Sequence, residues 1–204
     1  MSGTFDYAVN FGPGSSNVIV DGLTFNPFGG GSTITGVSTD PDPLRTFAGS
    51  EGFFNIAPNL GGDANINSVI QPLIDANSGG DLSSFEVDLD ASNGQAYKMQ
   101  LIMMEEFFQV AGSRVFDITV DGVTVANNLD LYQVAVIDAA EAEGDAAVVV
   151  TYEFVSDGTV DINFSNDTSL AVLSGLTLEV VPEPSTLALS LLGGFGLCAR
   201  RRSA

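Results

Sequence analysis

Apolar and acidic side chains alternate with a strict period of two over residues 85–90. The apolar positions are Phe85, Val87 and Leu89. A strand points successive side chains to opposite faces, whereas a helix of about 3.6 residues per turn would spread this pattern around its surface. The same alternation returns at Tyr97, Met99, Leu101 and Met103. These segments therefore predict strands that each bury one face.

Turn signals separate the strand-like segments at short intervals. The strongest are two Asp-Gly pairs, Asp21-Gly22 and Asp121-Gly122, each flanked by apolar runs. An Asp-Gly pair suits the positive φ angles of a two-residue hairpin turn. Many short strands with regularly spaced turns indicate an all-β fold of two sheets packed as a sandwich. The expected core includes Val115, Phe116, Ile118, Val120, Val148, Val150, Tyr152 and Phe154.

Two segments depart from the β pattern. Helical spacing relates Ile66, Val69, Ile70, Leu73 and Ile74, with Asp63 as a candidate N-cap. Pro72 lies within this run, so the expected helix is short or interrupted. Residues 138–145 are rich in Ala and acidic side chains, and they predict either a brief helix or an acidic loop.

The charge balance excludes several classes of function. The net charge is −20, and only Arg45, Lys98 and Arg114 are basic before residue 200. Such a chain repels phosphate backbones, so we expect no nucleic-acid partner. Histidine is absent and Cys198 is the only cysteine, which excludes a Cys/His zinc site and an internal disulfide. Without histidine, a Ser or Cys nucleophile lacks its usual base.

The C-terminus joins three features in a fixed order. A rigid Pro-Glu-Pro tripeptide is followed by an apolar run at residues 187–199 and by an arginine cluster that favours the cytoplasmic side. The tripeptide and cluster are Pro182, Glu183, Pro184, Arg200, Arg201 and Arg202. This order resembles the PEP-CTERM sorting tail of Gram-negative bacteria. The resemblance implies export to the cell envelope or surface, transient membrane anchoring through this segment, and processing by an exosortase.

Length favours a temporary anchor. Residues 185–199 as a helix would span roughly 22 Å, against a hydrocarbon core of about 30 Å. An exported protein also needs a signal peptide, and residues 1–6 show neither its basic nor its apolar part. We therefore expect either that the true start lies further upstream or that the signal peptide has been removed.

The segment at residues 97–132 is more specific than a generic β pattern. A strand leads to Glu105 and the aromatic pair Phe107-Phe108; Gly-Ser-Arg-Val-Phe-Asp at 112–117, a hairpin and Leu-Asp-Leu at 129–131 follow. This order resembles the malectin and malectin-like carbohydrate-binding domains, as does the opening at residues 8–12. The resemblance implies a jelly-roll sandwich, here residues 1–180, that binds sugars at loops on one edge. Residues 181–204 would then form the sorting tail.

The resemblance also implies which residues contact a sugar. Phe107 and Phe108 match the family's aromatic pair, Glu105 its preceding acidic residue, and Tyr132 an aromatic position after the hairpin. Arg114 and Asp117 fall in its Gly-x-Arg-Val-Phe-Asp motif, where we expect structural roles. An aromatic ring face beside hydrogen-bonding groups at a concave edge is also what sugar binding requires physically. If instead the pair belongs to the core, the site is structural.

Two functions remain open from the sequence. The first is non-catalytic carbohydrate binding at the cell surface, linked to extracellular polysaccharide or a biofilm. The second is a structural matrix protein that self-associates without a sugar site. A structural calcium ion is compatible with Asp40, Asp42, Asp88 and Asp90, although no EF-hand spacing is present. No motif marks a catalytic pair, because the adjacent Glu105 and Glu106 would point to opposite faces of a strand, and we expect no enzyme activity.

Overall fold

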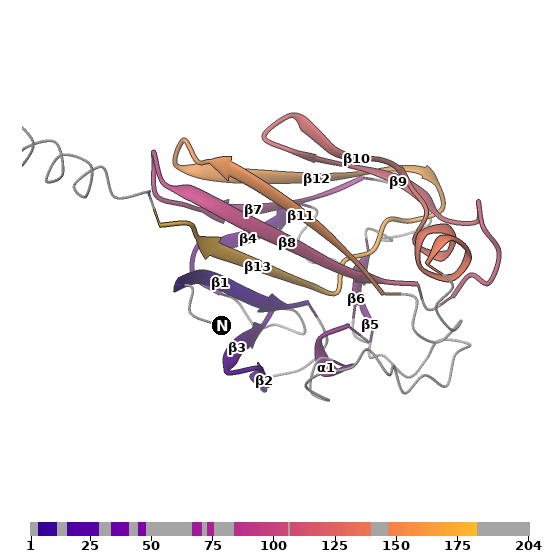
Figure 1. Ribbon diagram of the computed structural model, residues 1–204, viewed down its shortest axis with the longest axis horizontal. Coiled ribbons are helices and arrows are strands. Elements are labelled where there is room, and N and C mark those ends of the chain that lie inside the picture. The colour runs from indigo at the N-terminus through magenta and orange to yellow at the C-terminus, as the bar shows by residue number, and fades with distance from the viewer. Residues whose placement is uncertain are drawn as a thin grey trace, which may run out of the picture.

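The computed structural model describes residues 4–11, 16–28, 34–40, 45–47, 67–70, 73–75, 84–105, 107–139 and 147–182. Within them, strands form a six-stranded sheet in the order β11-β8-β13-β1-β3-β2 and a five-stranded sheet in the order β10-β9-β12-β7-β4. The two sheets face each other as layers of a sandwich (Figure 1). β5 and β6 pair separately. The predicted all-β, two-sheet architecture is confirmed.

The elements are short and follow the expected turns. The first strands are β1 Thr4–Asn10, β2 Val18–Val20, β3 Leu23–Pro27, β4 Val37–Asp40, β5 Arg45–Phe47 and β6 Leu73–Asp75. The later strands are β7 Phe85–Asp90, β8 Ala96–Met104, β9 Val115–Val120, β10 Val123–Leu129, β11 Ala147–Val155, β12 Thr159–Thr168 and β13 Gly175–Val180. The helical elements are α1 Asn67–Ile70 and a π-helix, η2, Gln133–Asp138.

The alternating segments form the facing surfaces of the two sheets. On β7, Phe85, Val87 and Leu89 are buried while their neighbours are not. On β8 the four apolar residues of the predicted alternation are completely buried. Across the core, Phe85 stacks on Phe164 of β12 with ring centroids 4.4 Å apart. The period of two in the sequence is therefore the period with which each strand buries its side chains.

Both Asp-Gly hairpins form as predicted. Asp21 and Gly22 join β2 to β3 with φ angles of 48° and 83°. Asp121 and Gly122 join β9 to β10 with φ angles of 49° and 74°. Positive φ at both central residues is the geometry of a type I′ turn, whose twist matches that of the paired strands.

The expected core is confirmed on β9 and is only partial on β11. Phe116, Ile118 and Val120 are completely buried, whereas Val115 is half-buried. On β11, Val148, Val150, Tyr152 and Phe154 all pack against the core but remain half-buried. β11 is an edge strand of its sheet, so only one neighbouring strand covers it.

The short helix expected around residue 70 forms, but the helical spacing predicted to include Leu73 and Ile74 is wrong. α1 ends at Ile70, and Leu73 and Ile74 belong to β6, which pairs with β5 through the Arg45–Asp75 register. Pro72 separates the two elements, in keeping with its expected disruption of the helix. Asp63 and Ile66 lie outside the described residues. η2 ends at Asp138, where the second expected helix or loop begins, and residues 140–146 are also outside them.

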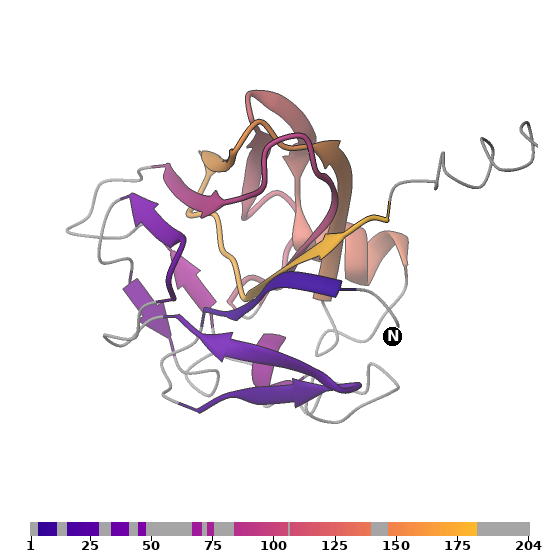
Figure 2. The same cartoon turned by 90° about the vertical axis from the view of Figure 1, so that its left-hand side faces the viewer.

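Strand direction defines two ends of the sandwich. Val180, at the end of β13, pairs with Tyr97 at the start of β8, and we call this the tail end. The opposite end, where β8 stops at Met104, is the loop end; η2 lies there (Figure 1). Figure 2 views the molecule from the tail end, with β2 and β3 beside β1 at the bottom of the view.

Candidate functional site

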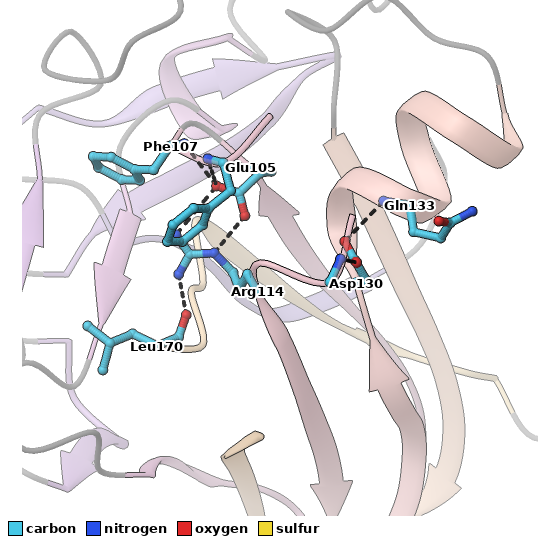
Figure 3. A network of polar contacts seen from close by, with 8 residues as sticks. Glu105, Phe107, Arg114, Asp130, Gln133 and Leu170 are labelled. Carbon is cyan, nitrogen blue, oxygen red and sulfur yellow. Dashed lines mark hydrogen bonds and ion pairs between the residues drawn. The ribbon is translucent and has the colours of Figure 1, made fainter. Parts of the chain in front are cut away.

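A buried carboxylate organises the chain where β8 stops at the loop end. Glu105 is 1% exposed. Its Oε1 accepts hydrogen bonds from the backbone N–H groups of Phe107 at 2.8 Å and Phe108 at 3.0 Å. Figure 3 shows Glu105 between Phe107 and Arg114. The side chain predicted to contact sugar therefore holds the backbone of the aromatic pair in place.

Arg114 completes this arrangement from the far side of the loop. Its Nε donates to Glu105 Oε2 at 2.6 Å, and its Nη1 donates to the carbonyl of Leu170. Arg114 is 4% exposed, so the ion pair is buried. A buried pair is favourable only when further hydrogen bonds satisfy both ions, as they do here. Arg114 thus joins the start of β9 to the end of β12, and its predicted structural role is confirmed.

The two phenylalanines differ in what they touch. Phe107 is half-buried and packs against the main core. Phe108 is also half-buried, and the guanidinium carbon of Arg114 lies 5.1 Å from its ring centroid. A cation within about 6 Å of an aromatic face attracts the ring. Phe108 is therefore held by the ion pair, while Phe107 is held by the core.

Asp130 and Asp117 accept hydrogen bonds from backbone N–H groups in the segments that follow the aromatic pair in the chain. Asp130 accepts hydrogen bonds from the N–H groups of Gly112 and, at 3.0 Å, of Gln133 (Figure 3). Asp117 Oδ1 accepts one from the N–H of Asn128 at 2.7 Å, which confirms its expected structural role. Sequence reasoning gave Asp130 no role. The available signal was the Asp-x-x-Gln spacing to Gln133, which is typical of a helix N-terminus.

Tyr132 lies at the start of the helical turn that Asp130 begins. It is the N-cap residue of η2 and is 7% exposed. The fold thus brings Glu105, Phe107 and Phe108 together, and it places Tyr132 at the same end of the sandwich. Only the two phenylalanines among these four leave a substantial part of the side chain at the surface.

Carboxylates gather on the outer face of the five-stranded sheet. Asp40 of β4 pairs with Glu86 of β7, and Asp88 pairs with Asp161 of β12. Partial burial raises the pKa of Glu86, and the Asp88, Asp161 and Asp40 charges raise it further. Burial and the Asp161 and Asp40 charges likewise raise the pKa of Asp88, against a lowering hydrogen bond from Ser38. In the part of the chain that the structure describes, no three such ligands are arranged to hold a metal ion.

The sorting tail lies almost wholly beyond the described part of the chain. Val181 and Pro182 are described; Glu183, Pro184 and Arg200, Arg201 and Arg202 are not. Val181 still belongs to the sandwich, because its N–H donates to the carbonyl of Ala96 at 2.9 Å. Across the ranges given above, none of the helices has the length and apolar character needed to cross a bilayer.

Two family models match this chain. The malectin domain matches residues 75–175, which contain the whole Glu105–Arg114 arrangement. The PEP-CTERM protein-sorting motif matches residues 180–202. This motif implies an exported cell-envelope protein. None of the curated proteins compared with the chain matches it.

Solved structures with the same fold come from plants and bacteria. The ANX1 ectodomain from Arabidopsis thaliana matches with a TM-score of 0.67 at 13% identity, over 88% of this chain and 49% of that one. The plant receptor-like kinase ANX2 matches with a TM-score of 0.66 at 13% identity, with the same coverage of 88% and 49%. The Bacteroides uniformis beta-glucuronidase matches at 0.55 and 19% identity, over 86% of this chain and 18% of that one.

The protein spans about half the length of the receptor structures that it matches. At these identities the likeness shows the fold, which is the malectin-like sandwich of two sheets. Together with the two family models, it identifies a chain that carries a malectin domain followed by a PEP-CTERM sorting motif.

Proposed function

We propose that this exported surface protein binds carbohydrate without catalysing a reaction, and that it is linked to extracellular polysaccharide or a biofilm. The observation that carries the proposal is the aromatic pair Phe107-Phe108 at the loop end, which we call the platform. Phe108 lies against Arg114, and Glu105 fixes the backbone of both phenylalanines. A ring that is already held in place loses little conformational freedom when a sugar stacks on it.

Each predicted residue takes a distinct part in this proposal. Phe108 supplies the stacking surface, and Phe107 supplies an adjoining apolar edge. Glu105 orients the pair, and Tyr132 supports the neighbouring helical turn. Hydrogen bonds to sugar hydroxyls would then come from the backbone and polar groups around the pair rather than from the buried Glu105 carboxylate.

The chemistry at the platform favours binding over hydrolysis. Glycoside hydrolysis uses two carboxyl groups about 5–10 Å apart, one of them able to give up a proton. Both oxygens of the buried Glu105 carboxylate are engaged by Arg114 and two backbone N–H groups. Histidine is absent from the whole chain. The beta-glucuronidase likeness covers only 18% of that enzyme.

The proposed domains give the platform an outward position. We assign residues 1–180 to the sandwich and 181–204 to a sorting tail that an exosortase processes after transient membrane anchoring. β13 leads into the tail at the tail end, whereas Phe107 and Phe108 follow β8 at the loop end. A sandwich attached through its tail would therefore present the platform away from the membrane.

A glycan array with the full chain, with and without calcium, tests this proposal. We expect binding to a defined set of neutral glycans, and we expect Phe108→Ala to weaken it by about 1–3 kcal/mol. The matched control is Val155→Ala, which removes an exposed apolar side chain, 65% exposed, at the tail end. Failure of the wild-type chain to bind any glycan, or equal binding by Phe108→Ala, would reject carbohydrate binding at the platform.

The acidic sheet face favours a second candidate. Asp40, Glu86, Asp88 and Asp161 form a row of carboxylates that divalent cations can bridge between two molecules. The protein would then be a self-associating matrix component without a sugar site. Sedimentation velocity with calcium, with magnesium and with chelator tests it. Calcium-dependent association that Asp88→Asn and Asp161→Asn remove would support the matrix function, and an unchanged monomer would refute it.

A further inference from the structure

Two adjoining hollows lie at the tail end, away from the aromatic pair. Their volumes are about 550 Å³ and about 450 Å³. Asp6, Tyr7 and Thr35 line both of them. Small-molecule sites commonly occupy about 300–1,000 Å³, so each hollow is large enough for a ligand. Asn26 lines the first hollow, and Asp90 lines the second.

The backbone of β1 opens the first hollow. β1 pairs with β3 at Val9 and Asn10, and the residues of β1 before Val9 pair with no described strand on that side. On its other side, β1 shifts register against β13 between Phe5 and Tyr7. A bulge of this kind leaves one residue out of the ladder and redirects its side chain. Here that residue is Asp6, which faces the hollow.

Glycine at position 36 creates the space for Tyr7. Gly36 has a φ angle of 79°, and a Cβ there would lie 2.3 Å from the Tyr7 hydroxyl and 3.1 Å from Asp90 Oδ2. Any other residue would therefore collide with the phenol. The Tyr7 hydroxyl makes no hydrogen bond with another residue in the described part of the chain. As far as the described residues go, it remains available as donor and acceptor in the wall shared by the two hollows.

Neighbouring bonds fix the position of the Asp6 carboxylate. Tyr97, which is fully buried, donates its hydroxyl hydrogen to Asp6 Oδ2 at 2.5 Å. The same Tyr97 oxygen accepts the N–H of Ser92 at 3.1 Å. Asp6 is itself exposed and lines both hollows. Asp6 is thus a fixed member of the wall.

We infer that these hollows form a second binding site, for a neutral, hydroxyl-rich saccharide. The half-buried Tyr7 packs against the core and also lines both hollows. Its hydroxyl can donate or accept, and the carboxylates of Asp6 and Asp90 can accept short hydrogen bonds from hydroxyl groups. Thr35 and Asn26 add neutral polar groups. This combination of one aromatic surface with convergent polar groups in a concave wall is what a sugar requires.

The properties of the wall of the two hollows disfavour anionic ligands and metal ions. Asp6 and Asp90 repel an anionic ligand, and the net charge of −20 adds to that repulsion. The described residues contain no cluster of three potential ligands for a metal ion. Burial and the Asp90 and Asp6 charges raise the pKa of Tyr7, so its hydroxyl keeps its proton at neutral pH. A neutral polyol fits all three conditions.

Nuclear magnetic resonance on the full chain tests the inference one residue at a time. The probes are the neutral trisaccharides maltotriose, cellotriose and laminaritriose, with tri-galacturonic acid as the anionic comparison, all at millimolar concentration. We expect at least one neutral probe to shift the amide signals of Tyr7, Thr35 and Ala91 in a saturable way. We expect the anionic probe to leave them unchanged.

Variants separate this site from the platform at the loop end. Tyr7→Phe keeps the ring and removes the hydroxyl, and we expect it to weaken binding about five-fold, the contribution of one hydrogen bond. Thr35→Ala is a second variant at an exposed position and should also weaken it. Tyr152→Phe is the matched control, because β11 lies three strands away from β1.

The amide signals of Phe107 and Phe108 report binding at the platform independently. Binding at the platform and binding at the hollows are therefore tested by separate signals. The inference is overturned if none of the neutral probes shifts the signals around Tyr7. It is equally overturned if Tyr7→Phe and Thr35→Ala bind as tightly as the wild-type chain, or if the anionic probe binds there.

Discussion

Arg114 Nε lies 2.6 Å from Glu105 Oε2, and both side chains are almost completely buried. This ion pair ties together the end of β8, the start of β9 and the end of β12, because Glu105 also binds the aromatic pair and Arg114 binds Leu170. The shape of the loop end therefore depends on one pair of opposite charges.

Removing one member of this pair should strongly destabilise the fold. Arg114→Met leaves the Glu105 carboxylate buried without its partner, a change that costs about 3–5 kcal/mol. Urea unfolding measures this loss, with Lys98→Ala on β8 as the control, expected to cost under about 1 kcal/mol. Glu105→Gln should couple to Arg114→Met by about 0.5–3 kcal/mol in a double-mutant cycle. Strictly additive losses would contradict the interaction.

The two phenylalanines should respond differently to replacement by alanine. Phe107 packs against the core, so Phe107→Ala should lower the free energy of unfolding by about 1–3 kcal/mol. Phe108→Ala should leave the fold closer to wild type and weaken glycan binding by about 1–3 kcal/mol. Thermal unfolding and titration of each variant separate the two effects. Equal loss of stability in both variants would make the pair structural.

Gly36→Ala should destabilise the protein more than Gly22→Ala does. Both glycines have positive φ, 79° and 83°, so both substitutions carry the same backbone cost. A Cβ at Gly22 meets nothing within 4 Å, whereas at Gly36 it lies 2.3 Å from the Tyr7 hydroxyl. The difference between their denaturant midpoints measures the collision of the added Cβ with Tyr7 and, at 3.1 Å and 3.2 Å, with Asp90. Tyr7→Phe combined with Gly36→Ala should recover part of that difference.

Mild acid should stabilise the sandwich through its acidic face. The pKa values of Glu86 and Asp88 are raised above 4.5 and 3.8, so the folded state binds protons more tightly than the unfolded chain. Their unfavourable contribution is present at neutral pH and is relieved as pH falls through the raised values towards the ordinary ones. Melting temperatures between pH 7 and pH 4 measure this, and Glu86→Gln with Asp88→Asn should flatten the dependence. If the melting temperature still rises towards pH 4 in the variant with both substitutions, groups other than Glu86 and Asp88 cause the effect.

The sorting tail should be absent from the mature surface protein. A run of 13 apolar or small residues with three glycines is a poor permanent anchor, and its match to a sorting motif predicts removal after about Pro184. Mass spectrometry of protein taken from the cell surface measures the new C-terminus. Peptides that contain Phe195 or Cys198 in the mature protein would show that the tail is retained.

Local sequence patterns predicted the parts of the fold that local geometry controls. Alternation at Phe85–Asp90 and the two Asp-Gly turns gave strands and hairpins, because side-chain direction and positive φ are properties of neighbouring residues. The spacing of Leu73 and Ile74 wrongly predicted a helix, because these residues pair with β5, which lies more than 25 residues earlier in the chain. Long-range pairing overrides local periodicity at such positions.

The candidate site follows the same rule. The motif around Glu105, Phe108 and Arg114 is compact in sequence, so its residues were found together, although the burial of Glu105 was not foreseen. The hollow beside Tyr7 was not predicted. It depends on Gly36 and Asp90, which meet Tyr7 only because β4 and β7 belong to the opposite sheet.

β8 fixes how far the aromatic pair stands from the point where the tail begins. Its nine residues extend about 30 Å at roughly 3.3 Å each, between the level of Val180 and that of Glu105. That is nearly four times the distance of about 8 Å over which salt screens charge at physiological ionic strength. If the tail holds the chain at the membrane, as we propose, salt would screen the charge of the lipid surface before it reached a glycan at Phe107 and Phe108.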